Sequence, residues 1–345
     1  MLYKSDIDNI LQIQFYDTNL FTYSLINLFT YKNNEVTMSE FKVKFRGVRG
    51  SYPIADKDFL QYGGNTSCVE VNVNGHLIIL DAGTGLINIG NELLGKHIAS
   101  GINPSERTPI SATVLISHIH QDHLQGFTFF RPLHIPSSQI DVFGNVNYNE
   151  SLADELAGLL FGKSFPLDLG DIAGNLNIKD LNETEGIILR HGQTPIIKRI
   201  ENENDTKVEG DDVLITCYRS YAHPQEGVLI YKIAYKDKIL VYATDKESYE
   251  GGDKKLVNFA RNCNLLIHDA QYTTEDYLDT FAPKQGYGHS TFEMAVECKN
   301  QSNAEKLVFF HFDPSYDDNK LNSIKEHYKD ENIILAYEGL EIELI

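Results

Sequence analysis

The sequence contains few cysteines, and none of them are arranged as a metal-binding pair. Four of the 345 residues are cysteine, and no two have the C-x-x-C spacing of a zinc knuckle. The neighbours of these cysteines are apolar or strand-like. We therefore expect buried free thiols, as in a protein of the reducing cytoplasm. The four residues are Cys68, Cys217, Cys263 and Cys298.

A long uninterrupted apolar run is also missing. The segment 11–31 is rich in aromatic and apolar residues, but Gln, Asp and Asn interrupt it five times. It therefore lacks the roughly 18 consecutive apolar residues of a transmembrane helix, and we expect no membrane span. Asp6 and Asp8 precede it, so the positively charged start of a signal peptide is absent.

The first convincing strand pattern begins only at residue 41, where apolar and basic residues alternate over 41–46. Residues 1–37 are therefore interpreted as an N-terminal extension, and 38–345 as the main domain. The extension either packs on the domain as a helix or is dispensable. In the second case Met38 is the true start.

Positive charge is scarce. Lys plus Arg number 30 against 49 for Asp plus Glu, which gives a net charge of −19. The average field of such a chain repels polyanions, although a local basic patch could override it. No cluster of Lys and Arg lies between residues 123 and 223. Nucleic acid is therefore expected to be an unlikely partner.

The strand and helix patterns predict an α/β fold. Residues 68–73 and 77–80 form a hairpin pattern around Asn74-Gly75. The middle, 131–210, is less regular, with a strand at 140–143 and a helix at 151–161. In each half strands precede helices, and helices are expected at 253–261, 291–300 and 318–328. This order suits a sandwich of two sheets flanked by helices.

Six consecutive residues, 118–123, contain three imidazoles and a carboxylate, which are the side chains that suit zinc and similar divalent ions. They follow a strand-like run at 112–117. His118 and His120 point the same way at the end of a strand because the side-chain period is two. Asp122 and His123 are adjacent and must diverge, so the motif can serve two metal ions. A histidine-rich loop without a ligand is the disfavoured alternative.

Three further ligand candidates stand where a strand meets a loop. His223 precedes a strand, and Asp245 and His311 each follow one. Taken singly, each is more often a cap or a satisfied polar group. A site for two ions needs about seven or eight protein ligands, and these three with the four of the motif fill most of it.

The H-x-H-x-D-H motif and the order of the later ligands resemble the metallo-β-lactamase superfamily, over most of residues 41–345. Four phrases make the phosphodiesterase branch, which includes ribonuclease Z and cyclic-nucleotide phosphodiesterases, the most similar one: GVRGS at 47–51, YGGNTS at 62–67, LDAGTG at 80–85 and GHST at 288–291. The resemblance implies the superfamily's αββα four-layer sandwich. It also implies that one metal is held by His118, His120 and His223, that the other is held by Asp122, His123 and His311, and that Asp245 bridges them.

Three more residues are candidates for a role in the site. His289, in GHST, corresponds to a histidine that lies beside the metals in this branch, and otherwise it is part of a helix N-cap. Asp269 resembles an acidic position near that histidine. Asp81 is expected to orient a ligand histidine. Its alternative role is to cap a turn.

The resulting prediction is a metal-dependent phosphodiesterase with two divalent ions, zinc or else manganese. In it, hydroxide bridging the two ions attacks phosphorus, Asp122 orients that hydroxide and accepts its proton, and His289 protonates the leaving oxygen. The expected substrate is a small phosphodiester, a 3′,5′-cyclic nucleotide, and the expected assembly is a homodimer.

Several alternatives remain. The first is a ribonuclease Z-type tRNA 3′-endonuclease, which the acidic total and the missing basic arm disfavour. A glyoxalase II-like thioester hydrolase shares the ligands but not the GHST motif. Phosphoribosyl cyclic phosphodiesterases typically carry a cysteine-rich metal site that this chain lacks. The alternative outside enzymes is a degenerate binding module. Such a module should have lost metal ligands, and none of the expected ligands is missing here.

Overall fold

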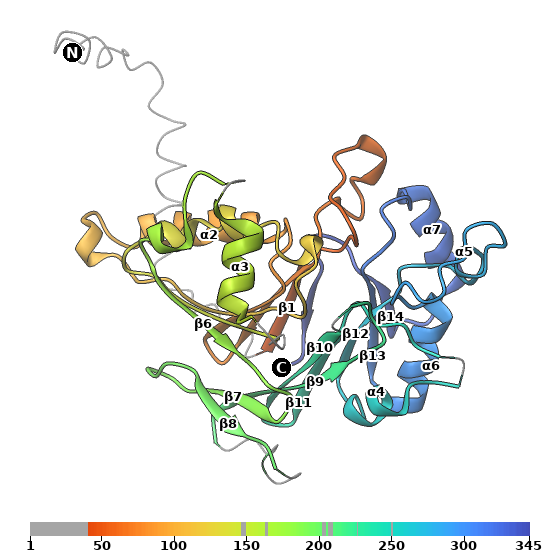
Figure 1. Cartoon of the computed structure of the whole chain (residues 1–345). Helices are drawn as coiled ribbons and strands as arrows, with labels where there is room; N and C mark the ends of the chain where they lie inside the picture. The colour runs from red at the N-terminus through yellow and green to blue at the C-terminus, as the bar shows by residue number, and fades with distance from the viewer. Residues whose placement is uncertain are drawn as a thin grey trace, which may run out of the picture. The chain divides into compact units, whose positions relative to one another are not determined.

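Two β-sheets form the middle of the fold in the computed structural model (Figure 1). The structure describes residues 41–345, except 146–149, 163–164, 202–204, 206–209, 226 and 250. The predicted extension, 1–37, lies outside the described residues. Whether it is dispensable therefore stays a prediction.

The first sheet has the strand order β15-β1-β2-β3-β4-β5-β6. Its strands are β1 Phe41–Gly47, β2 Cys68–Val73, β3 His76–Leu80, β4 Ser111–Leu115, β5 Gln139–Gly144, β6 Asn175–Asp180 and β15 Glu341–Glu343. The predicted hairpin around Asn74-Gly75 joins β2 to β3, with Val73 paired to His76. The C-terminal β15 pairs with β1, so the two ends of the domain meet in one sheet.

The second sheet has the order β14-β13-β12-β11-β10-β9-β7-β8. Its strands are β7 Glu185–Leu189, β8 Ile196–Arg199, β9 Val213–Ser220, β10 Val228–Tyr235, β11 Lys238–Ala243, β12 Leu265–Asp269, β13 Lys306–Phe310 and β14 Ile333–Leu335. Strands β6 to β8 lie in the middle region, which the sequence patterns described only as less regular. Two of them are edge strands with partly exposed residues, so their alternation of apolar and polar side chains is weak.

Helices cover the outer faces of both sheets. Figure 1 shows α2 and α3 beside the first sheet, and α4 and α6 beside the second. The helices are α2 Leu86–Ala99, α3 Leu152–Leu160, α4 Lys254–Phe259, α5 Thr274–Tyr277, α6 Phe292–Ser302 and α7 Asp318–His327. This arrangement is the predicted αββα sandwich.

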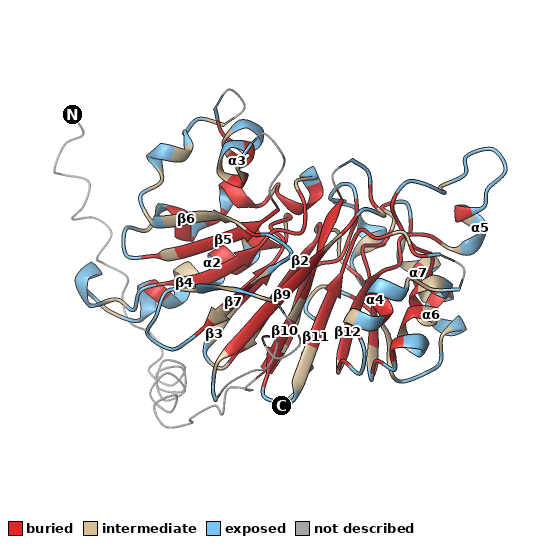
Figure 2. Ribbon diagram, turned by 60° about the horizontal axis from the view of Figure 1, so that its bottom comes forward, coloured by how far each residue is buried: buried red, intermediate tan, exposed pale blue. Residues whose placement is uncertain are grey.

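The alternation of side chains along each strand divides the core into two parts. Val69 and Val71 of β2 point into the cluster between the sheets, whereas Cys68 belongs to the cluster under α2 and α3. Figure 2 shows the buried residues running along β2, β9, β10 and β11, and exposed residues on the outer helices. Both faces of β9 and β10 are therefore almost entirely buried, which explains their largely apolar sequences, whereas β2 carries the partly buried Glu70 and Asn72.

Two predictions about composition can be compared with this fold. All four cysteines are buried and free, as expected. None of the helices in the described part of the chain has the length and apolar character needed to span a bilayer.

Candidate metal centre and active site

The predicted site residues follow the carboxyl ends of several strands at one edge of the sandwich. Asp81 follows β3, and His118 comes shortly after its parallel neighbour β4. Asp245 and His311 follow β11 and β13, and Asp269 ends β12. Strands β11, β12 and β13 are parallel, so their ends bring these side chains to the same edge.

Three histidines form the first cluster. His118, His120 and His223 each offer a ring nitrogen within one group of the size of a metal site. The His223 Nε2 and His120 Nδ1 atoms are 3.0 Å apart, and the His118 and His223 ring centroids are 4.8 Å apart. These are the three residues that the resemblance assigned to one ion.

The second cluster combines two histidines with two carboxylates, and all four residues are buried. The Nε2 atoms of His123 and His311 lie 3.2 Å apart. Asp122 Oδ2 lies 3.3 Å from His123 Nε2 and 3.1 Å from His311 Nε2. The fourth member is Asp245.

Asp245 faces both clusters, one with each carboxylate oxygen. Its Oδ1 lies 3.7 Å from His118 Nε2 and 3.8 Å from His223 Nε2. Its Oδ2 lies 3.1 Å from His123 Nε2 and 3.3 Å from His311 Nε2. A carboxylate placed in this way can bind two cations at once, one through each oxygen.

The hydrogen bonds of the imidazoles fit metal ligation. His223 Nδ1 donates to the Gly288 carbonyl and His123 Nδ1 donates to Asp81, which leaves both Nε2 atoms facing the clusters. His118 Nε2 is buried and has no hydrogen-bond partner. A buried polar nitrogen without a partner costs free energy, and a cation at this position would remove that cost.

The pKa shifts of the histidines differ between the clusters. Burial lowers the pKa of His118 well below its ordinary value and that of His223 to about 4, which favours the neutral rings that ligate metals. Burial also opposes the charge of His123, but the carboxylates of Asp245, Asp122 and Asp81 outweigh it and raise the pKa of His123 well above its usual range. A cation bound at His123 would displace the proton that these carboxylates otherwise favour.

Hydrogen bonds of Asp81 connect a histidine of one cluster to a histidine of the other. Its Oδ2 accepts hydrogen bonds from His123 Nδ1 at 2.8 Å and from the Ser117 hydroxyl at 2.8 Å. Ser117 Oγ in turn lies 3.0 Å from His118 Nδ1. The Tyr242 hydroxyl donates to the same carboxylate at 2.7 Å. The sequence analysis expected Asp81 to orient one ligand histidine; it contacts one directly and reaches another through Ser117, and neither Ser117 nor Tyr242 was singled out.

His289 and Asp269 form a buried pair beside the clusters. Asp269 Oδ2 accepts from His289 Nδ1 at 2.7 Å, and Oδ1 accepts from the Ser290 amide at 2.9 Å. The His289 ring stacks on His311, with centroids 5.0 Å apart, and its Nδ1 lies 3.9 Å from Asp245 Oδ1. Asp245, Asp269, His289 and His311 could by spacing also hold an ion. The hydrogen bonds of Asp269 to its neighbours favour the positioning role instead.

Close backbone packing holds the surrounding loops against these residues. A Cβ at Gly50 would lie 2.4 Å from His311 Cε1, and one at Gly288 would lie 2.3 Å from His223 Nδ1. Asp245 and His311 both have positive φ, at 49° and 66°. Non-glycine residues adopt this conformation at a cost, and such strain is concentrated at functional sites.

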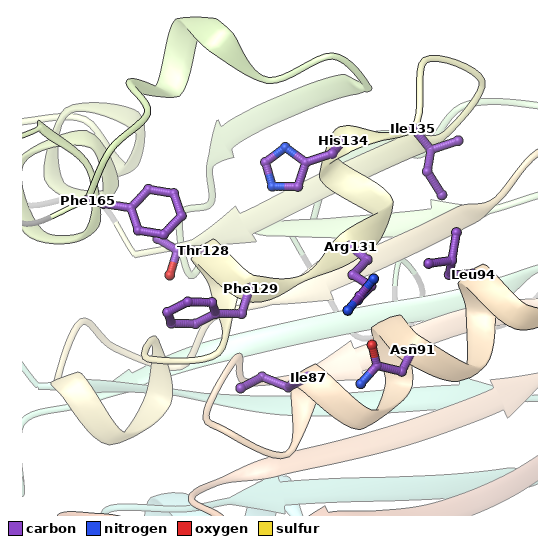
Figure 3. A pocket seen from close by; sticks show the side chains of 9 residues that line it. All are labelled: Ile87, Asn91, Leu94, Thr128, Phe129, Arg131, His134, Ile135 and Phe165. Carbon is purple, nitrogen blue, oxygen red and sulfur yellow. The ribbon is translucent and has the colours of Figure 1, made fainter. Parts of the chain in front are cut away.

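A large surface cavity is separate from this centre. It measures about 680 Å³ and is bordered by α2, by the turns at 127–134 and by Phe165 (Figure 3). Figure 3 shows Phe129 and Phe165 facing it from one side and Ile87 and Asn91 from another. None of the predicted metal ligands lines it, so the size of a cavity does not identify the reactive site in this molecule.

The sequence matches a model of a known protein family. The family is described as "Beta-lactamase superfamily domain", and the match covers residues 76–312. The chain belongs to the metallo-β-lactamase superfamily. Curated relatives include a ribonuclease Z of Picrophilus torridus, 25% identical over 85% of this chain and 93% of the relative. A ribonuclease Z of Pyrococcus horikoshii is 24% identical over 80% of this chain and 87% of the relative.

Solved structures show the same fold. The metallo-β-lactamase fold protein YhfI from Bacillus subtilis aligns with a TM-score of 0.58 at 15% identity, over 88% of this chain and 98% of that one. The short form of human tRNase Z aligns with a TM-score of 0.54 at 17% identity, over 88% and 99%. The family match and the ribonuclease Z relatives show that the protein is a metal-dependent hydrolase of the phosphodiesterase type.

Two predictions made from the sequence are wrong. The relatives that match most of the chain are ribonucleases, which contradicts both the cyclic-nucleotide substrate and the view that nucleic acid is an unlikely partner. The argument relied on the net charge of −19. At physiological ionic strength charges are screened beyond about 8 Å, so the local charges around the site count for more than the total.

Proposed function

We propose that the protein is a ribonuclease Z-type endonuclease. It would hydrolyse a phosphodiester bond of a tRNA precursor near the 3′ end of the mature tRNA. One observation carries the proposal. The His289–Asp269 pair adjoins a carboxylate that faces two metal-sized clusters, in a chain similar to ribonucleases Z over most of its length.

The proposed cofactors are two divalent ions, zinc or else manganese. His118, His120 and His223 would hold one, and Asp122, His123 and His311 would hold the other, with Asp245 shared. When bound, such ions make water more acidic and offset the negative charge that develops on phosphoryl oxygens. The imidazole and carboxylate set suits zinc, and the share of carboxylate is compatible with manganese.

Asp122 is proposed to orient the attacking water and to accept its proton. The Ser51 amide donates to Asp122 Oδ2 at 2.7 Å, which fixes the carboxylate relative to His123 and His311. The residue is buried, so its oxygens face the site and not bulk solvent.

His289 is proposed to protonate the oxygen of the departing strand. Asp269 accepts a hydrogen bond from Nδ1, which orients the ring and leaves the other ring nitrogen for the substrate. The stacking of this ring on His311, a proposed ligand of the second ion, supports the assignment.

The test is a substrate panel for the purified, metal-loaded protein. A tRNA precursor with a 3′ extension, cyclic AMP, cyclic GMP and a thioester would be compared, and the cleaved RNA bond would be mapped. Cleavage of the precursor at one position near the 3′ end of the mature tRNA is expected. Turnover of a cyclic nucleotide or a thioester without any cleavage of RNA would contradict the proposal.

A matched pair of variants links the activity to this site. His289→Ala should lose most of the RNA cleavage, whereas His327→Ala, which changes an exposed histidine in α7, should retain it. Similar losses in both variants would indicate general damage and would remove the support for His289.

The homodimer and the cytoplasmic location stay predictions. Light scattering of the purified chain measures the first, and localisation of the tagged protein in cells measures the second. The four free, buried cysteines are compatible with a reducing compartment.

A further inference from the structure

Exposed aromatic side chains are concentrated on the loops around the metal centre. Among the described residues, seven Tyr or Phe side chains are exposed, and four of them lie within four residues in sequence of Ser51, His223, Asp245 or His289. These four are Tyr52, Tyr221, Tyr249 and Tyr287, and the other three are Phe129, Phe281 and Tyr337. Burial of such rings is the usual outcome in a folded protein, so a group of exposed rings beside one site indicates binding.

Three of the tyrosines are tied to the site through short backbone connections. Tyr52 follows Ser51, whose amide donates to Asp122. Tyr221 lies two residues before His223. Tyr287 precedes Gly288, whose carbonyl accepts from His223 Nδ1 at 3.0 Å.

Hydrogen bonds to Glu247 also hold the loop of Tyr287 in place. Glu247 accepts hydrogen bonds from the Gly286 and Gly288 amides, at 2.8 Å and 3.1 Å, and from the Tyr277 hydroxyl. Its position two residues after Asp245 links this loop to the bridging carboxylate. Tyr287 is nevertheless 55% exposed, Tyr52 54% and Tyr221 69%, so the three rings are held near the centre but available to a ligand.

A cation accompanies two of these rings. The Arg219 guanidinium lies 5.9 Å from the centroid of the Tyr221 ring, and the Lys284 ammonium lies 5.6 Å from that of Tyr287. An aromatic face beside a positive charge is the combination with which proteins bind the bases and phosphates of single-stranded nucleic acid. These two residues supply local positive charge in a chain whose total is negative.

Tyr249 differs from these three in its surroundings. The Lys246 ammonium lies 5.9 Å from the centroid of its ring, but this ammonium is buried and paired with Asp253. The ring also lines a cavity of about 520 Å³ together with Glu247, Glu293 and Glu297. Carboxylates repel the phosphates of RNA, so this ring is a poor platform for a nucleotide. It therefore provides a control of the same residue type near the same site.

We infer that Tyr52, Tyr221 and Tyr287 stack on the unpaired nucleobases that flank the scissile phosphate. This inference rests on the proposed function, because it assigns single-stranded RNA as the occupant of the loops. Nucleotides fit better than a protein partner, since the rings adjoin a phosphodiester-cleaving centre and any RNA whose phosphate enters it must place its neighbouring bases at the rim. Base readout is not required, because every base has a face that can stack.

The first experiment compares two substrates of the full-length, metal-loaded protein. One is the 3′-extended tRNA precursor, and the other is bis(p-nitrophenyl) phosphate, which has no nucleobase. Each Tyr→Ala variant should lower kcat/KM for the RNA by about 5- to 100-fold, mainly through KM. The ratio of kcat/KM for RNA to that for the diester should fall, and Tyr→Phe variants should restore it because the ring is retained. Tyr249→Ala should leave the ratio unchanged.

The second experiment measures stacking without cleavage. A short single-stranded oligoribonucleotide containing 2-aminopurine, whose fluorescence falls on stacking, is added to the full chain carrying His289→Ala. Quenching by this chain, and its loss on further change of the three tyrosines to alanine, is the expected result.

The outcomes separate this inference from the proposed function. If the wild-type chain quenches the probe but cleaves no RNA, the proposed function fails and the stacking platform stands. If RNA is cleaved but the ratio and the quenching do not depend on the three rings, the platform is rejected and the function stands. If Tyr249→Ala has the same effect as the three alanine variants, or if no oligonucleotide binds, the inference is overturned.

Discussion

Asp81 accepts a hydrogen bond from His123 at 2.8 Å and lies behind both metal-sized clusters rather than inside either of them. The same carboxylate accepts from the Ser117 amide and hydroxyl, and Ser117 contacts His118. One fully buried side chain therefore sets the orientation of a histidine in each cluster. Residues of this kind fix the orientation of the ligating rings, because an imidazole binds a metal only when the lone pair of its nitrogen points at the ion.

Asp81→Asn should weaken metal binding in both clusters. The amide is nearly isosteric with the carboxylate but carries no charge and cannot accept from His123, Ser117 and Tyr242 in the same way. The expected loss is about 10- to 100-fold in metal affinity, measured by competition with a chromogenic chelator. Asp237→Asn changes an exposed aspartate in a turn and should have no effect. Wild-type affinity in Asp81→Asn would show that the carboxylate does not position the ligands.

Asp245→Ala should abolish RNA cleavage and reduce the metal content while the chain stays folded. The two oxygens of this carboxylate face the two clusters, so under the proposed assignment its loss removes a ligand from each ion. Elemental analysis and circular dichroism of the variant check the two parts of this prediction, with Asp237→Ala as the matched control. A variant with normal metal content and normal turnover would exclude Asp245 from the site.

His289→Ala should lower turnover by about 10²- to 10⁴-fold, the usual range for the loss of a general acid, with the metals retained. The loss should be much smaller for bis(p-nitrophenyl) phosphate, because nitrophenolate leaves without a proton. Asp269→Asn should follow the same trend to a lesser degree, since it acts through His289. Equal losses on both substrates would reject the general-acid role.

The sequence was informative about the site because its ligands are local or stand at strand ends. Four of the seven predicted ligands lie within 118–123, and Asp245 and His311 follow apolar strands whose carboxyl ends must share an edge of the sheet. The structure brings all seven together in two groups. Their assignment as metal ligands stays a prediction.

Contacts between distant residues could not be predicted in the same way. Tyr242 reaches Asp81 across 161 positions, and nothing in the spacing of the two residues indicates that they meet. The sequence of 124–130 is typical of the start of a helix, but the structure forms a short 3₁₀ turn there, at 127–129. Its direction is set by tertiary hydrogen bonds, such as that from the Gly126 amide to the Ala82 carbonyl, which local sequence does not encode.

A chain beginning at Met38 should fold and cleave RNA. Residues 1–37 contain no predicted ligand, and the first described strand begins at Phe41. The shortened and full-length proteins should have similar melting temperatures and similar kcat/KM. Insoluble or inactive shortened protein would instead show that the segment 11–31 is needed by the domain.

The most direct test of the account is a metal titration of RNA cleavage. Protein treated with EDTA and freed of the chelator would receive zinc or manganese in measured equivalents, and cleavage of a 3′-extended tRNA precursor would be followed at each step. The account predicts no cleavage by the metal-free protein and a rise in activity that ends at two equivalents per chain. Cleavage that is unaffected by EDTA, or a fully loaded protein that leaves the precursor intact, would contradict it.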